Sequence, residues 1–223
     1  MQENIKESLF STSVFDVIPA SMQDDFLLTL DMRLKSFNRG DLLFTQGEEI
    51  IYLPVILKGS VRAEMFSASG NTLQIDVIKA PEVLAAAFVF ASRNRIPVSV
   101  TALEDGEILK LSIPSLQNAF VKYPDFSNAF MRHVADRVFF LTEKINFLNI
   151  KTIKGKLAQL ILTRSVNNTF SLPMNQTELS RFFGIERPSL ARALSEIIQD
   201  KIITLRKNKG EILNIKQLKA LLA

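Results

Sequence analysis

NQTELSRFFGIERPSLARALSEIIQDKII, positions 175–203, contains two short amphipathic helical patterns that meet at a single glycine, Gly184. Asn175 is placed to cap the first helix, and Glu178, three residues later, completes a capping box. The apolar face of this helix comprises Leu179, Phe182 and Phe183. Two short helices joined by a glycine-containing turn are typical of a helix-turn-helix.

The second helix is expected to begin near Glu186, with Pro188 in its first turn, where the missing amide donor costs little. Its inner stripe comprises Leu190, Leu194, Ile197 and Ile198. Its outer face carries Arg187, Ser189 and Arg192. The N-terminal part of the second helix of such a motif enters the DNA major groove. We therefore expect Arg187 and Ser189 to contact base edges and Arg192 to read a base or guide the helix.

The charges of the chain are unevenly distributed. Positions 151–223 hold 13 Lys plus Arg and 5 Asp plus Glu, a net +8, whereas positions 1–150 hold 14 basic and 18 acidic residues, a net −4. An ordinary helical hairpin that is charged only for solubility needs no such segregation. Binding to a phosphate backbone, which releases counterions, favours a concentration of basic residues in one part of the chain. The charge distribution therefore supports binding to double-stranded DNA.

Downstream, two short apolar runs, Ile202–Leu205 and Ile212–Ile215, flank the polar stretch Arg206–Glu211. This pattern predicts a β-hairpin wing. Basic residues at its tip can hold phosphates or only improve solubility, and they are Arg206, Lys207 and Lys209. We expect Lys209 to contact phosphates, together with Gln176 and Thr177 at the start of the first helix.

Length and composition indicate a soluble protein of two domains. The chain has 223 residues, 47% of them hydrophobic, which is enough for two modest cores. No stretch approaches the roughly 18 uninterrupted apolar residues of a membrane-spanning helix. The N-terminal MQENIKESLF lacks the basic-then-apolar order of a signal peptide. We therefore expect a cytoplasmic protein that does not enter a membrane.

Cysteine is absent, which excludes disulfides, thiolate zinc sites and cysteine-ligated iron–sulfur clusters. The single histidine argues against a metal-dependent enzyme, since such a centre needs a cluster of histidine and carboxylate ligands. We therefore expect no catalytic residues and no metal site. An alternative of another class is an architectural protein whose basic end binds nucleic acid without sequence preference.

The region before position 126 is predicted to be rich in β-structure. A helix is expected around Met22–Leu34, with Ser21 as its cap. Strand-like runs follow, and the glycines that mark turns between them are Gly40, Gly47, Gly59 and Gly70. Short strands punctuated in this way suggest a small barrel or a double-sheet jelly roll, not a parallel α/β sheet.

Alternation within this region supports two-faced strands. Val61, Ala63 and Met65 alternate with Arg62, Glu64 and Phe66. After a turn expected at positions 67–71, the apolar side of the alternation continues at Leu73, Ile75 and Val77. An alternation of this kind is typical of a strand with one face on a core and the other toward solvent.

A long helix is predicted from about Phe126 to Asn149, between the β-rich region and the basic one. Its apolar residues follow heptad spacing at Met131, Val134, Val138, Leu141, Ile145 and Leu148. The helix either lies on its own β domain or pairs with a second copy of the chain. We favour self-association, because a helix-turn-helix usually works as a symmetric pair. Further apolar surface comes from Phe139, Phe140 and Phe147.

The chain resembles the Crp/Fnr family of bacterial transcription regulators over nearly its whole length. One match is RGDLLFTQGEEIIYLPVILKGSVR at positions 39–62, which is similar to the first barrel hairpins of the family. The other is FFGIERPSLARAL at positions 182–194, at the recognition helix. The ordered combination of both motifs with a heptad helix between them is specific to this family.

The resemblance implies an α+β chain in three parts. These are an N-terminal β jelly roll, or double-stranded β-helix, that senses an effector (1–125), a dimerisation helix (126–150) and a winged helix-turn-helix (151–223). It implies a homodimer that binds a near-palindromic operator and recruits or hinders RNA polymerase. It also implies that Arg187 and Arg192 face the groove.

Family members that bind cyclic nucleotides hold the ribose with a Gly-Glu pair and the phosphate with a later Arg-Ser or Arg-Thr pair. By alignment those places are filled here by Ala85 and Ala86, then by Ile96 and Pro97. A buried cyclic phosphate would therefore lack its compensating partner. We expect no response to cyclic AMP, although a shifted anion site at Arg93 and Arg95 is left open.

The corresponding pocket region is apolar through the run VLAAAFVFA at positions 83–91, which includes Phe88. The helix positions that would face a nucleotide base are Leu141 and Thr142. Such a pocket prefers a hydrophobic ligand or a haem, or else small and aromatic side chains have filled it. His133 is a candidate axial haem ligand or a packing residue. Many members have a glutamate after the first arginine of the recognition helix, where this chain has Pro188, followed by Ser189. The operator should therefore differ from that of those members.

Overall fold

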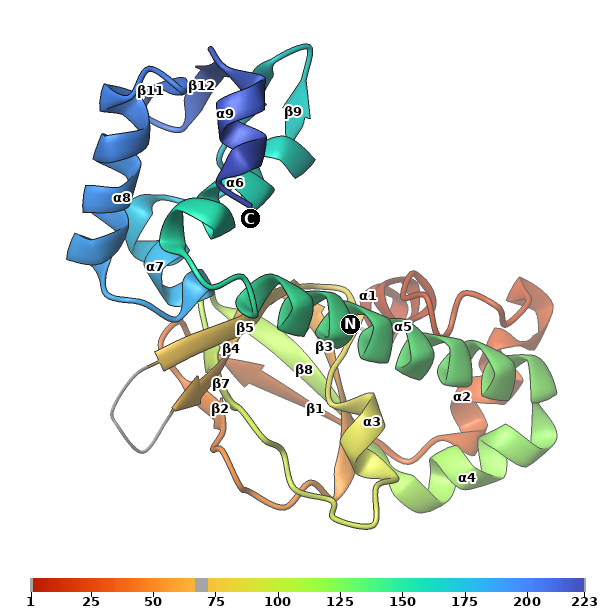
Figure 1. Cartoon of the computed structure of the whole chain (residues 1–223). Coiled ribbons are helices and arrows are strands. Elements are labelled where there is room, and N and C mark those ends of the chain that lie inside the picture. The colour runs from red at the N-terminus through yellow and green to blue at the C-terminus, as the bar shows by residue number, and fades with distance from the viewer. Residues whose placement is uncertain (1, 67–71, 223) are drawn as a thin grey trace. The chain divides into compact units, whose positions relative to one another are not determined.

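The computed structural model describes residues 2–66 and 72–222 (Figure 1). By their contacts, residues 2–66 and 75–140 form one unit, and residues 72–74 and 141–222 form a second. The division falls inside the helix α5 (Pro124–Leu148), which agrees closely with the helix predicted at Phe126–Asn149. The predicted boundaries at 125 and 150 stay a prediction.

The first unit is built on two four-stranded sheets with mainly antiparallel pairing (Figure 1). One has the order β1-β8-β3-β6, formed by Met32–Phe37, Gly106–Ser112, Tyr52–Lys58 and Glu82–Val83. The other has the order β2-β7-β4-β5, formed by Leu42–Phe44, Ser99–Ala102, Ser60–Phe66 and Thr72–Lys79. Most strands that pair in these sheets do not follow one another along the chain. Two such sheets confirm the predicted double-sheet β domain.

Short helices surround these sheets: α1 (Gln2–Phe10), the 3₁₀ turn η1 (Ala20–Met22), α2 (Gln23–Thr29), α3 (Ala86–Val89) and α4 (Ile113–Lys122). An aromatic cluster joins them to the start of α5. Phe126 is fully buried, with its ring centroid 5.0 Å from those of Phe15 and Phe26. The first half of α5 is therefore part of the core of the first unit.

The helix predicted at Met22–Leu34 is wrong in its second half. Helix α2 ends at Thr29, and Met32 begins β1. Every residue of β1 pairs with β8, from Met32 opposite Leu111 to Phe37 opposite Gly106. The ladder hydrogen bonds of this pairing override local helix preference. Ser21 is not a cap either, because it lies inside the 3₁₀ turn and Met22 takes the N-cap position.

The predicted alternation is only partly correct. Val61 and Ala63 are buried, but Met65 is exposed and Glu64 is buried. Arg62 accounts for the buried carboxylate, since its Nε lies 2.9 Å from Glu64 Oε2. In β5 the expected inner residue Val77 is exposed and Gln74 is buried. The turn predicted at 67–71, with Gly70, lies outside the described residues.

The second unit is a winged helix-turn-helix. It contains α6 (Ile153–Thr163), α7 (Gln176–Phe183), α8 (Arg187–Gln199) and α9 (Ile215–Ala220), and a four-stranded sheet of order β11-β12-β10-β9. These strands are Ile203–Arg206, Lys209–Ile212, Thr169–Ser171 and Ser165–Val166. Its core buries Leu157, Ile161, Leu179, Phe183, Leu190 and Ile197.

The wing is confirmed, but its second strand was predicted too late in the chain. The strand β12 is Lys209–Ile212, not Ile212–Ile215. Arg206 pairs with Lys209 across a two-residue turn in which Lys207 has φ 53°. Asn214 then caps α9, with its Oδ1 accepting from the Gln217 N–H at 3.0 Å, so the apolar run beyond Ile212 belongs to a helix start.

The hairpin β9–β10 was not predicted from the sequence. Its turn is the pair Asn167 and Asn168, with φ 51° and 62°. Asparagine tolerates this left-handed conformation well, and two such residues in succession suit a tight hairpin turn. The Asn-Asn pair was therefore a usable signal that was overlooked. Within the described residues, no helix is long and apolar enough to cross a bilayer.

Candidate nucleic-acid interface

The start of α7 is fixed by a capping box. Asn175 Oδ1 accepts from the N–H groups of Thr177 and Glu178, each at 3.0 Å. Glu178 Oε2 accepts in return from the Asn175 N–H at 2.9 Å. This confirms the predicted cap. It holds the exposed side chains of Gln176 and Thr177 in the first turn of a well-defined helix.

The turn between the two helices depends on Gly184. Its φ of 67° lies in the left-handed region, which glycine enters without a steric penalty. The Ile185 N–H then bonds to the Ser180 carbonyl at 3.0 Å, which closes the end of α7. Glu186 is the N-cap of α8 and Pro188 lies in its first turn, as the sequence predicted.

The inner face of α8 differs from the prediction at one residue. Leu190, Leu194 and Ile197 are buried, as expected, but Ile198 is 37% exposed and Ala193 is buried in its place. A stripe with the helical repeat of 3.6 residues runs through positions 190, 193, 194 and 197, and Ile198 lies one step further round. On the other side Arg187 and Arg192 are exposed and Ser189 is half-buried.

An ion pair between α6 and α8 affects the charge beside Arg192. Lys154 Nζ lies 2.8 Å from Glu196 Oε2. The hydrogen bond to Glu196 raises the pKa of Lys154, and the same bond lowers the pKa of Glu196. Glu196 stands one turn after Arg192, yet among the described ion pairs its partner is Lys154. The charge of Arg192 also contributes to lowering the pKa of Glu196, after the contribution of Lys154.

The wing carries a basic, hollowed face. Arg206 and Lys209 stand opposite each other in the β11–β12 pairing, and Lys207 occupies the turn. All three side chains are exposed. A cavity of about 790 Å³ lies on this sheet and is lined by Arg164, Arg206 and Lys209 together with Glu211. Arg164 was not predicted to be part of the interface, because it stands alone between α6 and β9, outside any motif.

The residues of the first unit expected to line the effector pocket are apolar and pack against its core. Ala85 caps α3 with φ 55°, while Ala86 and Ile96 are buried in the core of the first unit. Phe88 packs against the same core. Leu141 and Thr142 belong by contact to the second unit. Among the described residues, the positions of Ala85, Ala86 and Ile96 thus supply neither a carboxylate for a ribose nor a guanidinium for a phosphate.

The two arginines proposed for a shifted anion site lie on the surface of the first unit. Arg93 and Arg95 are both exposed. The Nη1 of Arg95 donates to the Gly47 carbonyl at 2.8 Å, so this guanidinium supports a loop. An anion site at Arg93 and Arg95 stays a prediction.

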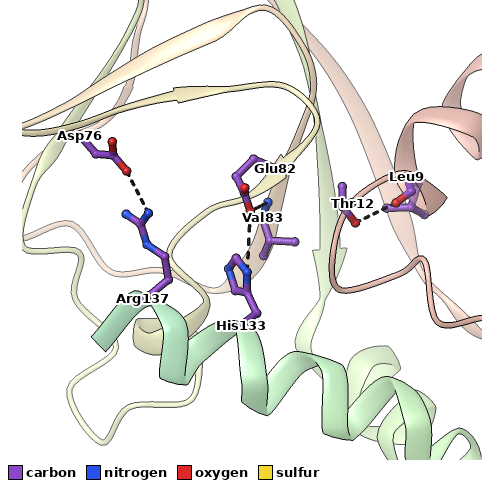
Figure 2. Close-up of polar contacts among 7 residues, drawn as sticks. All are labelled: Leu9, Thr12, Asp76, Glu82, Val83, His133 and Arg137. Carbon is purple, nitrogen blue, oxygen red and sulfur yellow. Dashed lines mark hydrogen bonds and ion pairs between the residues drawn. The ribbon is translucent and has the colours of Figure 1, made fainter. Parts of the chain in front are cut away.

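Two polar contacts connect α5 to the strands of the first unit (Figure 2). Arg137 Nη1 lies 2.9 Å from Asp76 Oδ2 on β5. His133, one turn earlier and only 8% exposed, places its Nδ1 3.8 Å from Glu82 Oε1 on β6. Burial lowers the pKa of His133, and Arg137 lowers it further, while Glu82 and Asp136 raise it. The imidazole is thus mainly neutral at pH 7.

His133 is therefore buried in the core, as in the packing alternative. Its Nε2 is buried without a described hydrogen-bond partner, which would suit an iron ligand, but its Nδ1 is directed at Glu82. Axial ligation of a haem by His133 stays a prediction.

The predicted seam of α5 is largely exposed in a single chain. Met131, Val138 and Ile145 are 60%, 56% and 58% exposed, and Phe139 is exposed beside them. Val134, Leu141 and Leu148 are half-buried. Exposed apolar side chains at heptad spacing are unusual for a surface helix that has no partner.

The fold and the exposed arginines of α8 define a DNA-binding protein of the winged helix-turn-helix class, preceded by a β-sheet domain of the effector-binding type. A family model for the cyclic nucleotide-binding domain matches residues 34–123, and one for the Crp-like helix-turn-helix domain matches residues 155–221. The chain belongs to the Crp/Fnr family of transcription regulators.

Individual relatives agree with this assignment. The chain is 19% identical to the global nitrogen regulator of Synechococcus elongatus over 83% of its length and 87% of the relative. It is 23% identical to the transcriptional activator FnrA of Stutzerimonas stutzeri, over 87% and 82%. A solved structure of a CooA mutant from Carboxydothermus hydrogenoformans superposes with a TM-score of 0.67, over 96% of this chain and all of that one. The two sequences are 18% identical, so this similarity shows the fold alone.

The environment of His133 predicts a pH-dependent stability. Its pKa in the folded protein lies below the unfolded value of about 6.5, so the unfolded chain binds the proton first as pH falls. The stabilisation is complete above pH 6.5 and is lost as pH drops toward the folded pKa. We expect His133→Gln to reduce the loss of unfolding free energy between pH 7 and pH 5, measured by urea denaturation. The exposed Arg132→Gln serves as control, and identical pH profiles for parent and His133→Gln would contradict the prediction.

Proposed function

We propose that the protein acts as a homodimer in the cytoplasm and binds a near-palindromic operator, where it recruits or hinders RNA polymerase. In this proposal residues 1–125 form the effector domain, 126–150 the dimerisation helix and 151–223 the DNA-binding domain. The observation that carries the proposal is the outer face of α8, where Arg187 and Arg192 are exposed while the opposite face is buried. A helix placed in this way can enter a major groove with its arginines toward the bases.

Separate roles are assigned to the basic and polar groups around α8. Arg187 and Ser189 contact base edges, and Arg192 reads a base or guides the helix into the groove. Phosphates are held by the first turn of α7 and by the wing, through Gln176, Thr177, Arg206, Lys207 and Lys209. All of these side chains except the half-buried Ser189 are exposed, and this exposure and the net charge of +8 over positions 151–223 support this division.

Dimerisation uses the exposed seam of α5. Met131, Val138 and Ile145 present an apolar row to solvent, whereas Phe126 on the same helix is buried in its own unit. A second copy of α5 would cover this row, with Val134, Leu141 and Leu148 completing the seam. Pairing two copies also supplies the two recognition helices that a palindrome requires.

The effector domain is proposed not to respond to cyclic AMP. Ala86 and Ile96 are buried among apolar side chains where a nucleotide would need a carboxylate and a guanidinium. Burying a phosphate without such partners costs several kcal/mol. A hydrophobic ligand, or control without a ligand, fits these residues better. Haem is a second candidate, favoured only by the unpartnered Nε2 of His133, and the absorption spectrum of the purified protein tests it through the Soret band.

Arg192→Ala should weaken operator binding by about 1 to 3 kcal/mol, because it removes a groove-facing guanidinium. The operator is first selected from a pool of random duplexes, and affinities are then measured by gel shift at fixed salt. Lys216→Ala, which removes an exposed cation on α9, is the control. Equal affinity of Arg192→Ala and the parent contradicts the role of Arg192. Equal affinity of the parent for operator and random duplex would instead favour an architectural protein.

Val138→Glu and Ile145→Glu should each convert the dimer to a monomer, because each places two carboxylates in an apolar seam. Sedimentation velocity over a range of concentrations measures the change. Val121→Glu on α4, at a side chain that is 85% exposed, is the matched control and should leave the dimer intact. A parent that sediments as a monomer, or a dimer that persists in both variants, argues against dimerisation through α5.

Cyclic AMP should give no saturable heat in isothermal titration calorimetry with the parent protein, because the expected site lacks both of its charged partners. The same titration with a family member that carries the Gly-Glu and Arg-Ser pairs provides the positive control. Saturable binding of cyclic AMP by this chain, with a matching rise in operator affinity, would overturn this part of the proposal.

A further inference from the structure

The last two turns of α5 hold a buried lysine. Lys144 is only 6% exposed, and its Nζ donates to the Phe182 carbonyl at 3.0 Å. The same Nζ lies 3.1 Å from the centroid of the Phe182 ring. An ammonium group removed from water is costly unless such partners compensate it. Lys144 and Phe182 therefore form a specific contact, not a solvated surface pair.

This contact is made at the C-terminal end of α7. The Gly184 and Ile185 N–H groups bond to the Arg181 and Ser180 carbonyls, and Lys144 supplies the donor for the Phe182 carbonyl. A positive charge is favourable at a helix C-terminus, because the last carbonyls and the helix dipole are negative there. Lys144 thus completes the end of α7 from a different helix, directly before the turn into α8.

An aromatic contact reinforces the same junction. The ring of Phe147 lies 5.3 Å from the rings of both Phe182 and Phe183. Lys144 and Phe147 are three residues apart and therefore share one face of α5. Ile145, on another face of the same turns, is largely exposed and belongs to the seam. One short helical segment thus carries both the contact to α7 and part of the surface proposed to meet a second chain.

We propose that Lys144 is a positioning residue that fixes the helix-turn-helix on the end of α5 and thereby sets the half-site spacing that the dimer accepts. This inference rests on the proposed dimer. If two copies pair along α5, the separation of their recognition helices depends on how each α7–α8 pair is held at its α5 end. A lysine with two directed contacts to α7 restricts that orientation more than apolar packing alone would.

A purely structural role for Lys144 makes a different prediction. A general loss of stability would weaken binding to every duplex by the same factor. A positioning role instead affects binding only when both half-sites are engaged. Discrimination between spacings therefore separates the two roles.

The test uses the full-length protein and an operator selected by the parent. Affinities are measured for that operator, for versions with two base pairs inserted into or removed from its centre, and for a single half-site. Lys144→Met should bind the selected spacing about tenfold more weakly. Its affinity for the half-site and for the altered spacings should stay close to that of the parent. Lys122→Met is the matched control, since Lys122 also lies over an aromatic ring, 5.2 Å from the Tyr123 centroid, but is exposed.

A direct measurement of orientation accompanies the binding data. The chain contains no cysteine, so spin labels can be attached only where Glu143→Cys on α5 and Ser195→Cys on α8 introduce it. Double electron–electron resonance should show a broader distance distribution between these labels in Lys144→Met than in the parent. Lys144→Arg, which keeps the cation, should behave like the parent in both assays. Lys144→Arg also serves as the test variant if Lys144→Met does not fold. In that case, a folded Lys144→Arg that no longer discriminates between spacings contradicts the inference.

The outcomes separate the two proposals. If the parent selects no spaced palindrome, the proposed dimeric operator binding fails and the inference fails with it. If the parent discriminates between spacings and Lys144→Met discriminates equally, with an unchanged distance distribution, only the positioning role of Lys144 is overturned. A uniform loss of affinity for all duplexes, half-site included, overturns it as well.

Discussion

The outward placement of the arginines of α8 depends on the burial of one apolar stripe of the same helix. Leu190, Leu194 and Ile197 enter the core of the second unit beside Leu179 and Phe183 of α7. Each such side chain contributes about 1.5 to 3 kcal/mol when it leaves water. Once that stripe is fixed, helix geometry turns Arg187 and Arg192 outward. The capping box of Asn175 and the left-handed Gly184 then fix where the two helices begin and end.

The first unit has the sheets of a cyclic nucleotide-binding domain, whereas the residues proposed to stand at its ligand position are apolar. Ala86 and Ile96 are buried where charged partners would be needed for a nucleotide. Because Ala86 and Ile96 belong to the core cluster, their packing contributes to the stability of the unit. A change of residue types can therefore alter what such a domain senses without altering its fold.

Three polar side chains of α5, two of them buried, make directed contacts along the helix. His133 and Arg137 face Glu82 and Asp76 in the first unit, and Lys144 caps α7 in the second. Heptad analysis concerns apolar positions and gives no information about these three residues. Their placement shows that α5 has a polar attachment on each unit in addition to its exposed apolar seam.

The sequence by itself determined the helix-turn-helix, its cap, its turn and the long helix, because these are local patterns whose residues are close in the chain. It also determined the double-sheet β domain, through the resemblance to the Crp/Fnr family. The limits of β1 were decided by pairing with β8, which follows it by some seventy positions along the chain. The burial of His133 and Lys144 likewise depended on partners distant in sequence, Glu82 and Phe182. Such contacts exist only when distant segments meet, so only the tertiary structure could decide them.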